Sequence, residues 1–174
     1  MDLLQKGSKG AFEEIYTRYS KTLLAFIYRM VNGDRTVSQD ILHDVFLKLI
    51  ENPKSFDTTK KFKPWLYTVA ANASRKFHRK PMTVEIGNDN NTIGKTHQPN
   101  LAAKKEFDNS LHKSLCKLSN EHKEVFILKH QQHLSTKEIA QTLNIPEGTV
   151  KSRLFTATRK LAKSLKQYNP REAI

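Results

Sequence analysis

Cysteines, glycines and long apolar runs are all scarce in this 174-residue sequence. A single cysteine, Cys116, excludes an internal disulfide and a metal site built from several cysteines. No apolar run approaches the ~20 residues that a membrane-spanning helix needs. Residues 1–10 also lack the apolar segment of a secretory signal. We therefore expect a soluble protein of a reducing compartment, the cytoplasm, with no metal and no other cofactor.

Acidic residues are also few, with 17 against 30 lysines and arginines, so the net charge is +13. This excess says little about the fold but favours a polyanionic partner. Residues 1–80 carry 15 basic and 8 acidic side chains, residues 81–104 carry 2 and 2, and residues 105–174 carry 13 and 7. Two basic segments therefore flank a neutral one.

The neutral segment, residues 81–104, is predicted to be a flexible linker. It contains Gly87 to Asn91 as an unbroken run of turn-forming residues, followed by Gly94 and Pro99. Loops longer than ~15 residues are uncommon inside compact domains. We therefore expect two domains, residues 1–80 and 105–174, with one long surface loop in a single domain as the alternative.

Apolar residues recur at helical spacing in both segments, and no strand-like alternation of useful length is present. In the first segment the stripes run over residues 12–30, 37–50 and 65–77. Thr36 with Gln39 has the form of a capping box for the second helix, and Pro64 suits the first turn of the third. The predicted fold class is all-α, with two small helical domains.

The second segment ends in a helix-turn-helix pattern. Ser135 and Glu138 form a capping box, Asn144 is a turn residue, and Pro146 is placed to open the last helix. From residue 148 to 170 the chain carries six basic residues and no acidic one, as a phosphate-binding stripe would. This pattern predicts DNA binding, and the alternative is a solvated basic face on a helical hairpin.

A second basic run lies between Asp57 and Glu85, where seven basic residues alternate with aromatic ones. Such composition suits unstacked bases and single strands. Most of these aromatics lie on the apolar stripe and are expected in the core, whereas Phe56 and Asn72 lie off it and are candidate base contacts. Lys60, Lys61, Arg75 and Arg79 are the cations expected to hold the strand.

Acidic residues gather on the second predicted helix, where Asp40 and Asp44 are one turn apart on one face. In a basic protein this face suits a basic protein surface, although a solvated face is the simpler interpretation. A hydrolytic metal site at Asp40, His43 and Asp44 is not favoured, because no further ligand has convincing spacing. No glycine-rich phosphate loop or nucleophile elbow is present, so we expect no enzyme activity.

Taken together, these blocks resemble an extracytoplasmic-function (ECF) sigma factor of the sigma-70 family, which keeps only conserved regions 2 and 4. The resemblance rests on residues 11–16, 40–46, 65–72, 138–140 and 148–154, which occur in the family's order and spacing. It implies that residues 1–80 are region 2 and residues 105–174 are region 4. It also implies core RNA polymerase, promoter DNA and an anti-sigma factor as partners, with no catalytic centre in the chain.

The resemblance further implies three sets of site residues. The polymerase contact is Asp40, His43, Asp44 and Phe46, and the downstream promoter element is met by the loop of residues 55–62 with Asn72. The upstream element is met by Thr149, Lys151, Ser152, Arg153, Phe155, Thr156 and Arg159. The sequence departs from the family pattern at His43, Ala71, Lys76 and Thr158.

Two other functions fit the residues less well. One is a helix-turn-helix transcriptional regulator that never serves as a polymerase subunit, and the other is an RNA-binding or nucleoid-type protein. The acidic second helix favours the sigma factor, because a simple repressor has no need of such a face.

Overall fold

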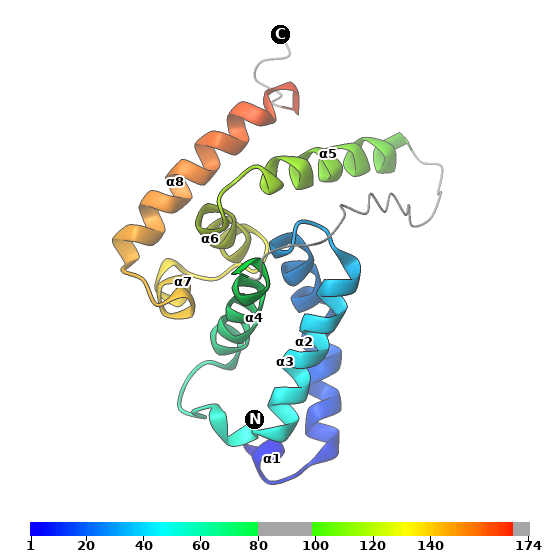
Figure 1. The fold of residues 1–174 in the computed structure, drawn as a ribbon, viewed down its shortest axis with the longest axis vertical. Coiled ribbons are helices and arrows are strands. Elements are labelled where there is room, and N and C mark those ends of the chain that lie inside the picture. Colours follow the sequence, from blue (N-terminus) through cyan, green and yellow to red (C-terminus); the bar gives the residue numbers. More distant parts are fainter. Residues whose placement is uncertain (80–98, 169–174) are drawn as a thin grey trace.

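A computed structural model describes residues 1–79 and 99–168, with side chains over residues 1–78 and 104–168. The described residues are helical and contain no strand, which confirms the all-α prediction (Figure 1). The elements in chain order are α1 (Asp2–Gln5), α2 (Lys9–Met30), α3 (Arg35–Glu51), η1 (Pro53–Ser55), α4 (Phe62–Arg79), α5 (Pro99–Cys116), α6 (Asn120–His130), α7 (Thr136–Leu143), α8 (Glu147–Ser164) and η2 (Lys166–Tyr168).

Local chemistry places the ends of α2 and α3. The turn between them uses Asn32 and Gly33, both at positive φ, and the side chain of Asp34 then accepts a hydrogen bond from the backbone of Val37 at 3.0 Å. Asp34, not Thr36, is therefore the N-cap of α3, so the predicted Thr36 capping box is wrong. A β-carbon at Gly33 would lie 2.8 Å from the ring of His112 in α5, so the turn also allows a close approach between distant segments.

Helix α4 begins at Phe62, two residues before the predicted start at Pro64. Its buried side is made of Leu66, Tyr67, Ala70 and Ala71, each fully buried. The ring of Tyr67 meets that of Phe26 edge to face at 5.2 Å, a favoured aromatic geometry. This side of α4 packs on both α2 and α3.

The helix-turn-helix forms as the sequence predicts. Ser135 and Glu138 make the reciprocal capping box of α7, Asn144 takes the left-handed conformation after it, and α8 starts directly after Pro146. The second domain begins earlier than expected, because residues 99–104 belong to α5 and not to the linker. Pro99 is a favoured first-turn residue. The rest of the predicted linker lies outside the described residues.

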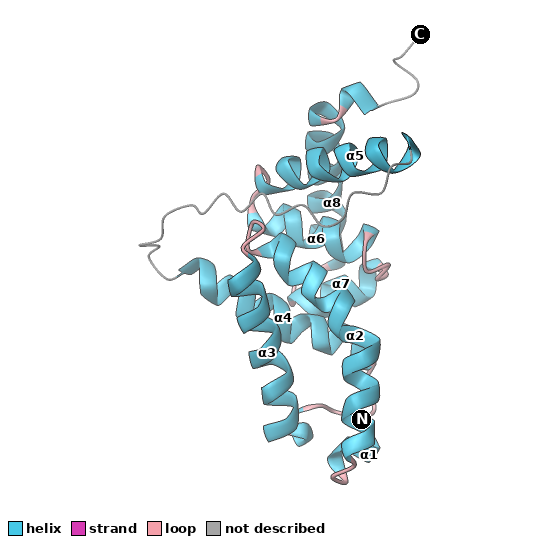
Figure 2. Ribbon diagram, turned by 90° about the vertical axis from the view of Figure 1, so that its right-hand side faces the viewer, coloured by secondary structure: helices cyan, strands magenta, loops and turns pink. Residues whose placement is uncertain are grey.

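The two domains pack against each other. Helix α7 contacts α4, and α5 and α6 contact α2, so that the second domain covers one end of the first (Figures 1 and 2). One continuous apolar core includes Leu66 of α4 together with Leu128, Ile139 and Leu143 of the second domain. A smaller cluster of Leu115, Leu118, Ala157 and Leu161 belongs to the second domain alone.

This shared core predicts that the domains unfold together. Replacing the buried Ile139 by alanine should cost about 2–5 kcal/mol of stability. It should also lower the denaturation midpoint reported by fluorescence of Trp65, the single tryptophan, which lies in the other domain. Leu161→Ala, in the smaller cluster, should lower the same midpoint, because a loss of stability in either domain shifts one cooperative transition. Equal midpoints for wild type and both variants would show that the domains unfold separately.

Candidate nucleic-acid and partner interfaces

The acidic face of α3 is presented to solvent. Asp40, His43 and Asp44 are all exposed. Phe46 is only 3 % exposed and packs on the rings of Phe12 and Tyr16. Phe46 therefore supports this face from within, which corrects its predicted role as a direct contact.

Exposed apolar side chains border this acidic face, and the sequence analysis missed them. Leu47 and Ile50 are 40 % and 50 % exposed, although Ile50 belongs to the helical stripe that was predicted to be core. Leu47 follows Asp44 by three residues and Ile50 follows Leu47 by three, so they continue the same face of α3. Acidic and apolar groups side by side are typical of a protein–protein contact. The apolar groups lose their contact with water, and the charges orient the partner.

The loop before α4 does not offer an aromatic ring to solvent. Phe56 is 3 % exposed and packs against Phe62 and Trp65, with ring centroids 5.4 and 5.2 Å away. Phe56 is therefore buried in the free protein, and its contact with a base stays a prediction. Burial against two aromatic neighbours outweighs its position outside the helical stripe.

The polar part of this loop forms a tight turn. Asp57 accepts hydrogen bonds from the hydroxyl and the backbone N–H of Thr59, and these bonds lower the pKa of Asp57. Lys60 lies 3.5 Å from the same carboxylate. Lys60 and Lys61 are exposed, so the turn presents cations at the start of α4.

Two of the four cations predicted to hold a nucleic-acid strand, Lys61 and Arg75, bind the second domain in this structure. Lys61 donates to the carboxylate of Glu138 at 2.8 Å. Arg75 makes a two-pronged ion pair with Glu124, at 2.7 and 2.8 Å, and its third nitrogen donates to Asn72 at 3.0 Å. Arg79 is the last residue of α4, and its side chain lies outside the described part.

Two consecutive buried residues of α6 bind opposite parts of the first domain. Glu124 is 2 % exposed and pairs with Arg75, whereas Lys123 is 1 % exposed and donates to the side chain of Asn32 at 2.6 Å. Burial raises the pKa of Glu124, with Arg75 opposing that rise, and burial lowers the pKa of Lys123. Removing one partner of a buried pair costs about 3–5 kcal/mol, because an uncompensated charge remains. These charges therefore specify how the domains dock.

A neutral hydrogen bond lies at the same contact. Tyr67 donates its hydroxyl to the side chain of Gln132, and the backbone carbonyl of Gln132 accepts from Lys63 at 2.6 Å. Burial raises the pKa of Tyr67 to about 12, so the phenol keeps its proton and stays a donor. None of these partners could be paired from the sequence, because 65 or more residues separate them.

The predicted reader of the upstream element lies at the N-terminal part of α8. Lys151, Phe155 and Arg159 repeat every four residues and are exposed, with Phe155 at 70 %. Ser152 is exposed beside them, whereas Thr149, Arg153 and Thr156 are half-buried. All seven predicted residues thus lie on one helix. Lys151, Phe155 and Arg159 form an exposed line along it.

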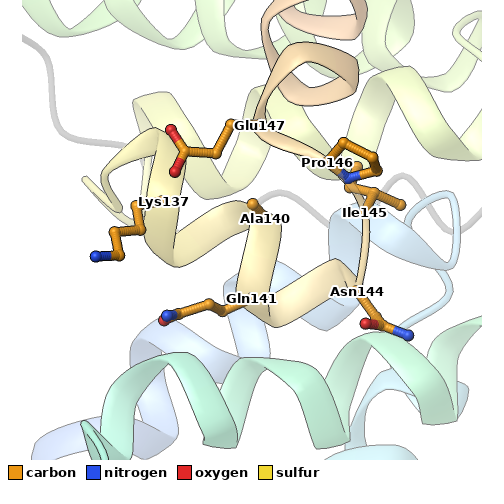
Figure 3. A pocket seen from close by; sticks show the side chains of 7 residues that line it. All are labelled: Lys137, Ala140, Gln141, Asn144, Ile145, Pro146 and Glu147. Atoms are coloured by element: carbon orange, nitrogen blue, oxygen red, sulfur yellow. The ribbon is translucent and has the colours of Figure 1, made fainter.

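An open depression of about 460 Å³ marks the corner between α7 and α8 (Figure 3). Lys137 and Gln141 of α7 and Glu147 of α8 extend over its rim, with Ala140 at its floor (Figure 3). Helices α7 and α8 contact each other at this corner, where the small side chain of Ala140 lies. The depression is open and lined by both polar and apolar side chains, so it does not enclose a small molecule.

Residues 1–78 and 104–168 contain no group of three or more histidine, cysteine, aspartate or glutamate side chains placed to hold a metal ion. The described helices also include none that is long and apolar enough to cross a membrane.

Comparison with known proteins identifies the family. Residues 15–82 match Sigma-70 region 2, and residues 108–161 match Sigma-70, region 4. The chain is 31 % identical to the ECF RNA polymerase sigma factor SigW of Bacillus subtilis, over 94 % of this chain and 93 % of SigW. The chain belongs to the ECF sigma factors. It is therefore an alternative sigma factor, which acts with core RNA polymerase in promoter-directed transcription initiation.

Other relatives agree with this assignment. The ECF sigma factor SigL of Mycobacterium tuberculosis is 30 % identical, over 88 % of both chains. The fold is shared with CnrH, solved in complex with the cytosolic domain of CnrY, at a TM-score of 0.74 and 22 % identity over 97 % of this chain and 96 % of CnrH. RpoE of Bartonella quintana, solved with the anti-sigma factor NepR, gives the same TM-score at 23 % identity over 90 % of this chain and 97 % of RpoE.

The contacts of Glu138 predict a loss of stability in acid. Hydrogen bonds from Lys61 and Ser135 lower the pKa of Glu138 to about 2. The stability that they provide is complete above the ordinary glutamate pKa of ~4.3 and is lost as the pH falls from there towards 2. Denaturant midpoints measured between pH 5 and pH 2.5 should fall less steeply in Glu138→Gln than in wild type. Glu106→Gln, at an exposed site of α5, is the control, and an unchanged slope in Glu138→Gln would contradict the assignment.

Proposed function

We propose that this sigma factor divides initiation among three surfaces of the chain. The exposed face of α3 binds core RNA polymerase, the loop of residues 55–61 with α4 holds the opened downstream element, and α8 reads the upstream element as duplex. The observation that carries the proposal is the separation of charge: an exposed acidic and apolar face on α3, in a chain of net charge +13, lies apart from basic surfaces on α4 and α8.

The α3 face suits a basic protein surface. Asp40 and Asp44 orient the partner and speed its association. Leu47 and Ile50 add apolar area that loses water on contact. DNA would repel these carboxylates, so the face is reserved for a protein partner. In this proposal the polymerase supplies the catalytic groups, and RNA synthesis takes place in the cytoplasm.

The α8 surface suits the major groove. Lys151 and Ser152, near the N-terminus of the helix, are placed to meet base edges, and Phe155 can contact a thymine methyl group. Arg159 lies two turns further along the helix, where phosphate contacts fix the orientation without reading sequence. Asn72 and Arg75 on α4 would act on a strand whose bases are already unstacked.

An anti-sigma factor is a further proposed partner. RpoE of Bartonella quintana was solved with one, and the fold of that chain matches this one over most of its length. The exposed apolar groups of α3, Leu47 and Ile50, are a surface that such a partner could cover in competition with the polymerase.

Charge reversal on α3 tests the polymerase surface. Asp40→Lys with Asp44→Lys should reduce binding to core polymerase at least tenfold, since a lost contact of a buried charge pair costs about 2–5 kcal/mol. Run-off transcription should fall in parallel, while the helical circular dichroism spectrum stays unchanged. The matched control is Glu106→Lys with Asp108→Lys on α5, which are exposed and make the same change in net charge. Wild-type affinity in the α3 variant would exclude this face as the docking surface.

Competition binding of the full chain to duplex DNA tests the α8 surface. Lys151→Ala with Ser152→Ala should cost roughly 1–3 kcal/mol on the preferred upstream element and relax the preference at the base pair that is contacted. Arg159→Ala should instead weaken preferred and scrambled duplexes alike. If the double variant keeps the full ratio between the two duplexes, Lys151 and Ser152 do not read bases.

A further inference from the structure

Three cations of the first domain are bonded to the second domain along one line of contact. Lys61 binds the carboxylate of Glu138, Lys63 binds the backbone carbonyl of Gln132, and Arg75 binds the carboxylate of Glu124. These cations belong to the loop and helix that the proposed function assigns to the opened downstream strand. Asn72, the candidate base contact, accepts a hydrogen bond from the same Arg75.

The chemistry of these contacts is that of phosphate binding. An arginine guanidinium binds a carboxylate and a phosphate with the same two parallel N–H bonds, so one excludes the other. Arg75 uses both N–H groups of such a fork on Glu124, and its remaining contact goes to Asn72. Three of the five N–H donors of Arg75 are therefore occupied in this arrangement, including both that would bind a phosphate in the same two-pronged way.

We propose that the second domain is an internal competitor for the single-strand-binding surface of the first, with Glu124 and Glu138 occupying the places of two phosphates. This inference rests on the proposed function of α4. The closed arrangement then blocks the downstream reader until the domains separate. Binding of a single strand and docking of the domains are mutually exclusive.

The other two surfaces remain available in the closed arrangement. Lys151 and Phe155 of α8 are exposed, and so are Asp40 and Asp44 of α3. The free protein can therefore meet duplex DNA or the polymerase before it can hold an opened strand. Nineteen residues join α4 to α5, and a chain of that length spans up to roughly 63 Å when extended. Separation of the domains is therefore compatible with the connection.

Opening needs a partner because the docked domains also share apolar core. Ile139 and Leu143 of α7 lie in the same cluster as Leu66 of α4, so separation exposes apolar area as well as breaking ion pairs. A ligand shifts such an equilibrium only by its preference for the open state. The opened strand has that preference, because the cations that would bind it are paired with carboxylates in the closed state, so binding of the strand would drive the change.

The test compares binding of the full chain to labelled single-stranded downstream element and to duplex upstream element, by fluorescence anisotropy without polymerase. The variant is Glu124→Gln with Glu138→Gln, which removes both charges and keeps side-chain size, and glutamine is accepted at the capping-box position of Glu138. The control is Glu106→Gln with Glu121→Gln. Both control residues are exposed, and the change in net charge is identical.

The variant should bind the single strand about tenfold more tightly than wild type and the control, because apparent affinity scales with the fraction of open molecules. Duplex affinity should be the same in all three proteins. Equal single-strand affinity in variant and control, with both binding, would overturn the competition while leaving the proposed function intact. Failure of every protein to bind the single strand would overturn the proposed downstream surface and the competition with it.

A charge swap gives an independent measurement that does not depend on DNA. Glu124→Arg should open the protein and increase its radius of gyration in small-angle X-ray scattering, because two guanidinium groups then face each other. Adding Arg75→Glu should restore the pair and the compact radius. If the double variant is as expanded as the single one, or if neither expands, the Arg75–Glu124 pair does not hold the domains together.

Discussion

The ion pair between Arg75 and Glu124 is the contact around which the two domains are arranged. Glu124 is almost completely buried, and a buried carboxylate is stable as an anion only with a well-placed cation and hydrogen bonds. Arg75 supplies both from the other domain. The neighbouring Lys123, also buried, donates a hydrogen bond to the side chain of Asn32 in the first domain. Two adjacent residues of α6 therefore fix the position of the second domain on α4 and on the α2–α3 turn.

The same contact connects structure with function. Under the proposed function, Arg75 lies where a nucleic-acid strand binds, and Glu124 of the same chain holds its guanidinium in a fixed orientation before the strand arrives. Lys61 has the same relation to Glu138. The acidic face of α3 and the basic line of α8 lie outside this contact. In the proposed function the protein thus presents two recognition surfaces while a third is covered.

Much of the architecture follows from local patterns. Helical spacing of apolar residues predicted the main helices, and the capping box of Ser135 and Glu138 with the turn at Asn144 predicted the helix-turn-helix. Errors arose where two local signals compete or where burial depends on distant segments. Asp34 replaced Thr36 as the cap of α3, Phe56 and Phe46 proved buried, and Ile50 proved exposed. A helical stripe shows which residues share a side, but not how far the neighbouring helices cover it.

The sequence by itself determined the helices, the helix-turn-helix, the charge separation and the family. These depend on residues at most a few turns apart or on the order of blocks along the chain. Only the tertiary structure decided that the domains are docked, and that Arg75 and Lys61 pair with carboxylates of the second domain. The pairs concerned are 49 and 77 residues apart, and the residues between them contain no signal for their register. That register is set by how α4 and α7 close one apolar core, which is a property of three-dimensional packing.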